Sequence, residues 1–132
     1  MRYHHLGYVV PNIDKACNDF AILGYCVSEV VDDLMRNIKI AFVRKEHISV
    51  ELIAPINVGS PVDNILKKMG PSPYHICYEV SSIDESIECL KISGWTLIKK
   101  PEPAIAIEGE GAAWVAFLYK KSSGLIELLQ FL

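Results

Sequence analysis

The sequence predicts an α+β fold in which two tandem βαβββ modules form one curved mixed sheet. Two observations lead to this fold class: an internal repeat, and the order of strand-like and helix-like segments within each copy. The repeat aligns residues 5–24 with residues 75–94 without a gap, at a shift of seventy positions. The matched residues are His5 and His75, Tyr8 and Tyr78, Val10 and Val80, Ile13 and Ile83, Asp14 and Asp84, and Gly24 and Gly94.

The first copy begins with a strand at residues 3–10, which are apolar and aromatic with several β-branched members. A helical period follows and ends at Gly24, because glycine is a common residue at the end of a helix. Its expected buried face is made of Ile13, Cys17, Phe20 and Ala21. Three strands complete the first module, which covers about residues 1–56; they are expected at 25–31, 37–45 and 47–55, with Asp32 and Asp33 in the turn between the first two.

A connecting helix and a second module follow, and we expect both modules to form a single domain over residues 1–132. Ser60 is a good N-cap with Pro61 at the first helical position, which predicts a linker helix over about residues 60–69. The second module covers about residues 73–132, and its helix starts at Ser82 in a Ser-x-x-Glu capping box. Its strands are expected near residues 74–80, 95–100, 114–120 and 124–132.

Composition and charge restrict the class of protein. The chain has 132 residues, of which 51% are hydrophobic, so one domain with a sizeable core is expected. The net charge is −3 and the basic residues are scattered, which argues against nucleic acid as a partner. No apolar run reaches the roughly 18 residues of a membrane span and the start lacks a secretory signal, so a soluble cytoplasmic protein is expected. The four cysteines form no CxxC pair, and we expect them to be reduced and buried.

Strand alternation predicts which side chains face away from the helices. If each helix covers the apolar face of its sheet, Leu6, Tyr8 and Val10 point toward the first helix, and His5 points to the opposite, open face. The same parity in the second module places His75 on the open face. Both repeat histidines are therefore expected to face the concave side of the sheet.

The last strand of each module supplies a carboxylate among apolar neighbours. Glu51 lies in "SVELIA" and Glu127 in "LIELLQ", and alternation places both on the face opposite the apolar set. Because an unpaired buried carboxylate costs several kcal/mol, a cation is expected beside them. Two histidines and two glutamates suit zinc, nickel, cobalt, manganese or iron and leave positions for water or substrate. The alternative is that these are satisfied core histidines and edge-strand glutamates.

Four segments, "HHLGYVV", "VELIAP", "YHICYEV" and "GLIELLQ", in this order and spacing, resemble the His, Glu, His, Glu pattern of the vicinal oxygen chelate superfamily. This superfamily includes the glyoxalase, bleomycin-resistance and dioxygenase proteins. The similarity spans almost the whole chain and is most detailed against the methylmalonyl-CoA epimerase branch. It implies a glyoxalase-like fold, with one divalent transition metal (Zn, Ni, Co or Mn) held by His5, Glu51, His75 and Glu127.

The resemblance also implies a reaction and a substrate class. A lyase or isomerase of the glyoxalase I or methylmalonyl-CoA epimerase type would move a proton next to the carbonyl of a thioester or hemithioacetal. Glu127 is the leading catalytic base, Glu51 its partner for the opposite face, and Glu79 a third candidate. The expected partner is this small molecule, with no nucleic acid or membrane. A homodimer is expected because exposed sheet edges are usually covered.

Two departures from the family pattern leave the substrate open. Met35 stands where the epimerase branch has a proton-transfer glutamate on the strand before the second ligand strand, and Val9 stands where glyoxalase I has a glutathione-binding arginine. Two other functions occur in the superfamily: a metal-free drug-binding or antibiotic-resistance protein, and an iron-dependent ring-cleaving dioxygenase. Intact ligands argue against the first, and the additional Glu51 argues against the second.

Overall fold

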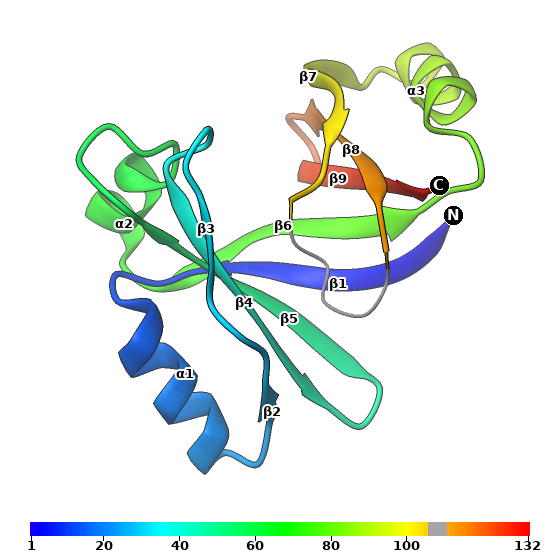
Figure 1. Ribbon diagram of the computed structural model, residues 1–132. Coiled ribbons are helices and arrows are strands. Elements are labelled where there is room, and N and C mark those ends of the chain that lie inside the picture. Colours follow the sequence, from blue (N-terminus) through cyan, green and yellow to red (C-terminus); the bar gives the residue numbers. More distant parts are fainter. Residues whose placement is uncertain (106–110) are drawn as a thin grey trace. The chain divides into compact units, whose positions relative to one another are not determined.

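The computed structural model describes residues 1–105 and 111–132 (Figure 1), and these residues divide into two compact units. We call His5–Tyr74 the first module, and Met1–His4 with His75–Leu132 the second module. The elements are β1 (Arg2–Val9), α1 (Ile13–Ile22), β2 (Cys26–Val27), β3 (Val31–Asp33), β4 (Ile38–Lys45), β5 (Ile48–Pro55), α2 (Asp63–Met69), β6 (Ser72–Glu79), α3 (Ile83–Ile92), β7 (Thr96–Pro103), β8 (Ala113–Lys120) and β9 (Gly124–Phe131).

The sheet of the first module is mixed. β1 pairs in parallel with β5, and β4 pairs antiparallel with β5 and with the short strands β2 and β3. Helix α1 packs on β2, β4 and β5 (Figure 1). The core under this helix contains Val10, Ile13, Ala16, Cys17, Ala41, Val43, Val50, Leu52 and Ala54.

The second module repeats this arrangement. β6 pairs in parallel with β9, β9 pairs antiparallel with β8, and β8 pairs antiparallel with β7, while α3 packs on the last three strands. The core under α3 contains Val80, Ile83, Ile87, Ala116, Leu118, Ile126 and Leu128. The predicted α+β fold with a repeated module is therefore confirmed. The second module has the βαβββ order, and in the first module the strand expected at 25–31 is replaced by the two short strands β2 and β3.

Helices α1 and α3 begin and end as the repeat predicts. The side chain of Asn12 caps α1 by accepting a hydrogen bond from the backbone N–H of Lys15, and the Ser82 side chain caps α3 through the N–H of Glu85. After the helices, Gly24 has φ 94° and Gly94 has φ 93°, a conformation that favours glycine. Within the described ranges, no helix combines the length and the apolar character needed to cross a bilayer.

The linker helix begins two residues later than the sequence predicts. Helix α2 starts at Asp63 and its N-cap is Val62, without a capping side chain. Ser60 and Pro61 form a preceding turn instead, in which the Ser60 carbonyl accepts from the Asp63 N–H and the Asp63 carboxylate accepts from the Gly59 N–H. The turn provides hydrogen-bond partners for the N–H groups of Gly59 and Asp63, and the helix begins after it.

Asp32 and Asp33 lie in strand β3, not in a turn as the sequence predicts. They pair with Lys39 and Ile38 of β4, and the carboxylate of Asp32 lies 3.3 Å from the Lys39 ammonium. The turn is formed by residues 34–37. Cross-strand pairing with a lysine therefore compensates the low strand propensity of aspartate.

The expected burial is wrong for three small residues. All four cysteines are free, but only Cys17 and Cys77 are buried, whereas Cys26 and Cys89 are exposed. Cys26 belongs to the two-residue strand β2, which has no buried residue, and Cys89 lies on α3 away from the buried Ile83 and Ile87. Ala21 is also exposed, and Ala16 takes its expected place in the core of α1.

One lysine in each module binds the end of its helix. The Lys45 ammonium donates to the Leu23 carbonyl at 2.8 Å, and the Lys120 ammonium donates to the Ser93 carbonyl at 2.7 Å. The last carbonyls of a helix lack intrahelical partners and carry partial negative charge, so a cation there is stabilising. These two hydrogen bonds connect the end of α1 to the end of β4, and the end of α3 to the end of β8.

We predict that Lys120→Met lowers the free energy of unfolding by about 0.5–1 kcal/mol, because the α3 carbonyl loses a charged donor. Urea unfolding followed by circular dichroism measures this change. Lys121→Met is the matched control, since Lys121 is the exposed neighbour in the β8–β9 turn. Equal midpoints for the two variants would contradict the assigned role of Lys120.

Candidate metal centre

In the first module, His5 and Glu51 lie on the sheet face that α1 does not cover. Val50 and Leu52, the neighbours of Glu51, are in the core under α1, so alternation sends the Glu51 side chain to the other face. His5 is 1% exposed and Glu51 is 8% exposed. The His5 Nε2 atom lies 3.9 Å from Glu51 Oε1. A buried imidazole and a buried carboxylate therefore face each other within this module.

The second module contains the equivalent pair, His75 and Glu127. Ile126 and Leu128 are in the core under α3, which directs the Glu127 side chain to the opposite face. His75 is 3% exposed and Glu127 is 6% exposed. The His75 Nε2 atom lies 2.8 Å from Glu127 Oε2, which is a hydrogen-bonding distance. The predicted parity of both histidines and both glutamates is confirmed.

The backbone places the two pairs at the same register. Gly7 is paired with Glu51 across β1 and β5, and Cys77 is paired with Glu127 across β6 and β9. Each histidine lies two residues before its paired position, on the same side of its strand. The repeat therefore extends beyond the matched residues 5–24 and 75–94 to the glutamate of the last strand of each module.

A phenylalanine packs against the histidine of each pair, and the sequence did not lead us to expect either one. Phe42 of β4 lies opposite Glu51 and makes an edge contact with the His5 ring, and Phe117 of β8 lies opposite Glu127 and makes the same contact with the His75 ring. Both are on strands of equivalent position, one strand beyond the glutamate strand. Aligning "IAFVRK" with "VAFLYK" reveals this match in the sequence.

The donor set of each pair fits a divalent metal. Within each module one imidazole nitrogen and one carboxylate oxygen are buried together, and burying an ionised carboxylate is costly unless a positive charge is near. Imidazole and carboxylate are ligands of zinc and of similar transition metals. Each module can therefore supply two ligands of a cation.

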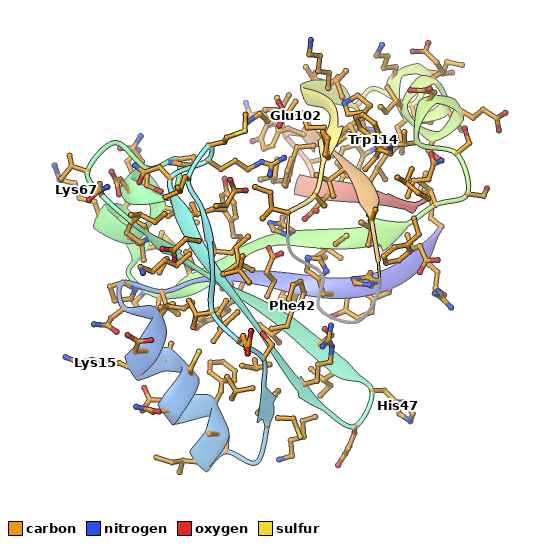
Figure 2. All side chains as sticks on the ribbon, viewed as in Figure 1. Lys15, Phe42, His47, Lys67, Glu102 and Trp114 are labelled. Carbon is orange, nitrogen blue, oxygen red and sulfur yellow. The ribbon has the colours of Figure 1, made fainter. Side chains whose placement is uncertain are left out.

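The remaining candidates lie elsewhere or have other partners. His4 is half-buried and its ring packs near Phe131, with ring centroids 5.9 Å apart. His47 is exposed in the turn between β4 and β5 (Figure 2). Glu79 forms an ion pair with Arg2, which reduces its suitability as the third candidate base.

Met35 does not lie on the strand before the second ligand strand, as the sequence prediction assumes. That strand is β4, whereas Met35 is 93% exposed in the turn before it. The β4 residues on the same face as Glu51 are Ile38, Ile40, Phe42 and Arg44, and none has a carboxylate. Asp33 of β3 pairs with Ile38 and is fully buried, but its carboxylate binds the Arg36 guanidinium at 2.7 Å.

Burial raises the pKa of a tyrosine and a cysteine in the first module and of a tyrosine in the second. It raises the pKa of the Tyr74 phenol, which packs against the cluster of Val9, Ile38 and Ile53. It also raises the pKa of the Cys17 thiol, with a smaller contribution from Asp14. For Tyr3, burial is the main cause of a raised pKa, followed by Cys77 and Tyr78. These three groups therefore stay neutral at pH 7.

We predict that the two pairs differ in their contribution to stability. In the metal-free protein, Glu127→Gln should lower the free energy of unfolding by about 1 kcal/mol more than Glu51→Gln. The reason is the distance: 2.8 Å for His75–Glu127 allows a charge-assisted hydrogen bond, and 3.9 Å for His5–Glu51 does not. Urea unfolding at pH 7 in the presence of a chelator measures the difference. An equal loss in both variants would show that the shorter distance confers no additional stability.

Known proteins share both the sequence pattern and the fold. The family model of the Glyoxalase/Bleomycin resistance protein/Dioxygenase superfamily matches residues 4–114. The mitochondrial methylmalonyl-CoA epimerase of Dictyostelium discoideum is 32% identical, over 96% of this chain and 76% of that protein. The ethylmalonyl-CoA/methylmalonyl-CoA epimerase of Cereibacter sphaeroides is 30% identical, over 98% of this chain and 97% of that protein.

Solved structures agree with this relationship. A hypothetical protein from Bacillus halodurans C-125 is 29% identical with a TM-score of 0.83, over 98% of this chain and 93% of that chain. The methylmalonyl-CoA epimerase of Mycobacterium tuberculosis has the same fold, with a TM-score of 0.81 at 23% identity, over 99% of this chain and 88% of that chain. The chain therefore belongs to the glyoxalase/bleomycin resistance protein/dioxygenase superfamily.

Proposed function

We propose that this chain is a metal-dependent isomerase of the methylmalonyl-CoA epimerase type, acting on a CoA thioester that also carries one free carboxylate. The observation that carries the proposal is the buried His–Glu pair, which recurs at the same register in both modules. The relatives at 30% and 32% identity, which match over nearly the whole chain, are named as epimerases. This relationship favours an isomerase over a lyase.

We propose that His5, Glu51, His75 and Glu127 together hold one divalent metal, which is Zn, Ni, Co or Mn. The support is chemical: the histidines direct Nε2 toward the carboxylates, and all four side chains are buried. Two imidazoles and two carboxylates form a mixed nitrogen and oxygen set of the kind found in catalytic sites, with positions left for substrate. When bound, the metal would polarise the thioester carbonyl and stabilise the negative charge that develops there.

The proposed proton transfer uses the two glutamates. Epimerisation requires a carboxylate to remove the proton from the carbon between the two carbonyl groups, and a proton to return on the opposite face. We assign removal on one face to Glu127 and transfer on the other to Glu51. Among the described residues of β3 and β4 on the Glu51 face, the one carboxylate is that of Asp33, which is bound by Arg36.

The other functions of the superfamily have less support. Val9, at the position of the glyoxalase I arginine, is fully buried against Ile38 and Ile53, so this position cannot bind the charged part of a glutathione hemithioacetal. Glu51, buried beside His5, is a fourth ligand that a dioxygenase with two histidines and one glutamate does not need. A metal-free drug-binding protein would have no use for two buried His–Glu pairs.

A homodimer and a cytoplasmic location remain predictions. The support for the dimer is the presence of outer strands: β2 is at one edge of the first module's sheet, and β7 is at one edge of the second module's sheet. Unpaired backbone groups of edge strands favour association with another chain. Association with a second copy would cover such an edge.

Metal analysis tests the proposed centre. We predict about one divalent transition metal per chain in the purified protein, and its loss in Glu127→Ala, because this change removes one ligand and the partner of His75. Glu79→Ala is the matched control. Glu79 is the last residue of β6, and its carboxylate forms an ion pair with Arg2 of β1. A metal-free wild type that is indifferent to Glu127→Ala would contradict the proposed centre.

Proton exchange tests the proposed reaction and distinguishes its two branches. In deuterated water, methylmalonyl-CoA should gain deuterium at its α-carbon with wild type, and at least about a hundredfold more slowly with Glu127→Gln, because general base catalysis contributes about that much or more. Mass spectrometry of the thioester measures the exchange. Methylglyoxal with glutathione serves as the alternative substrate, and turnover of this substrate alone would show a lyase.

A further inference from the structure

We infer that Phe42 and Phe117 are positioning residues, whose ring edges fix the imidazole orientation of His5 and His75 before metal binding. The inference rests on the proposed function, because the orientation matters for ligand atoms. It assigns a role to two residues that have no polar atom and cannot bind the metal themselves.

Each phenylalanine touches its histidine in the same geometry. The ring centroids of His5 and Phe42 are 5.3 Å apart with an interplanar angle of 86°, and those of His75 and Phe117 are 5.5 Å apart with 82°. Edge contacts at such distances are favourable for aromatic rings. The geometry recurs although the surroundings differ, since Phe42 lies under the Arg44 guanidinium and the residue equivalent to Arg44 is Tyr119.

The strand order explains why three side chains meet in each module. β5 lies between β1 and β4, and β9 lies between β6 and β8. The histidine comes from one flanking strand and the phenylalanine from the other, so their rings meet over the central strand that bears the glutamate. Phe42 lies directly opposite Glu51, and Phe117 directly opposite Glu127. Each phenylalanine thus packs beside the carboxylate and against the imidazole that faces it.

An edge contact restricts rotation of the imidazole about its χ2 torsion, which otherwise varies broadly. In both modules the restricted ring directs Nε2, and not Nδ1, at the carboxylate. Metal-binding histidines generally need a neighbouring group that fixes the ring orientation. A ring that is oriented before binding loses less conformational freedom on binding, which increases affinity.

Phe20 provides a matched control within the same protein. It also makes T-shaped contacts, with Tyr8 at 6.4 Å and with Tyr25 at 5.1 Å. These contacts lie in the core under α1, on the sheet face opposite His5. Phe20→Leu therefore removes an aromatic edge of the same kind and leaves the histidines untouched.

The first measurement is zinc affinity by calorimetry with a competing chelator. Phe42→Leu and Phe117→Leu keep apolar bulk but remove the ring edge, and each should weaken zinc binding roughly tenfold, as an edge contact of this kind implies. Phe20→Leu should change the affinity less than about twofold, since it does not touch a ligand. Amide NMR spectra establish that each variant is folded. Because the two variants alter different modules, the loss of folding in one leaves the other as the test.

The second measurement uses the metal-free protein and does not depend on the metal. NMR couplings and NOEs about χ2 should show one ring orientation for both histidines in wild type and in Phe20→Leu. Phe42→Leu should release His5 alone, and Phe117→Leu should release His75 alone. Folded variants that retain a single orientation overturn the inference. If wild-type protein fails to bind zinc or any of the other three metals, the proposed metal centre is wrong, and these NMR data still decide whether the phenylalanines orient the rings.

Discussion

Burial of a carboxylate on an apolar sheet face is the constraint on which the rest of this structure depends. Glu51 and Glu127 are each surrounded by strands whose other residues are mostly aliphatic, and ionised carboxylates are costly in such an environment. In each module one histidine from the neighbouring parallel strand faces this carboxylate. The imidazole alone compensates part of the cost, and a divalent cation shared by such ligands would compensate the rest.

The βαβββ module provides the frame that makes this burial possible. Its helix covers one face of the sheet with an aliphatic core, so the alternate residues of every strand are free to form a second face. Capping at Asn12 and Ser82, together with the Lys45 and Lys120 contacts, positions both helices in the same way. Duplication of this frame reproduces each buried histidine, the glutamate that faces it and the aromatic ring beside them.

The two modules diverge in the residues that surround the pairs. Gly7 is replaced by Cys77 beside the glutamate, and Arg44 corresponds to Tyr119 beside the phenylalanine. Asp33 of β3 is fully buried and binds Arg36, whereas the ion pair of β7 joins Lys99 to the half-buried Glu102. Epimerisation as proposed requires proton transfer on both faces of one carbon, and the two glutamates at equivalent positions would serve this requirement.

The sequence by itself determined the repeated βαβββ order, the parity of its strands and the His and Glu pattern, because hydrophobic periodicity and residue spacing are local properties. It misplaced the start of α2 and the strand containing Asp33, since backbone and cross-strand partners decided both. Only the tertiary structure decided which side chains meet over β5 and β9. Phe42 lies far from His5 in the chain, and the contact depends on strand order and register, which no single segment encodes.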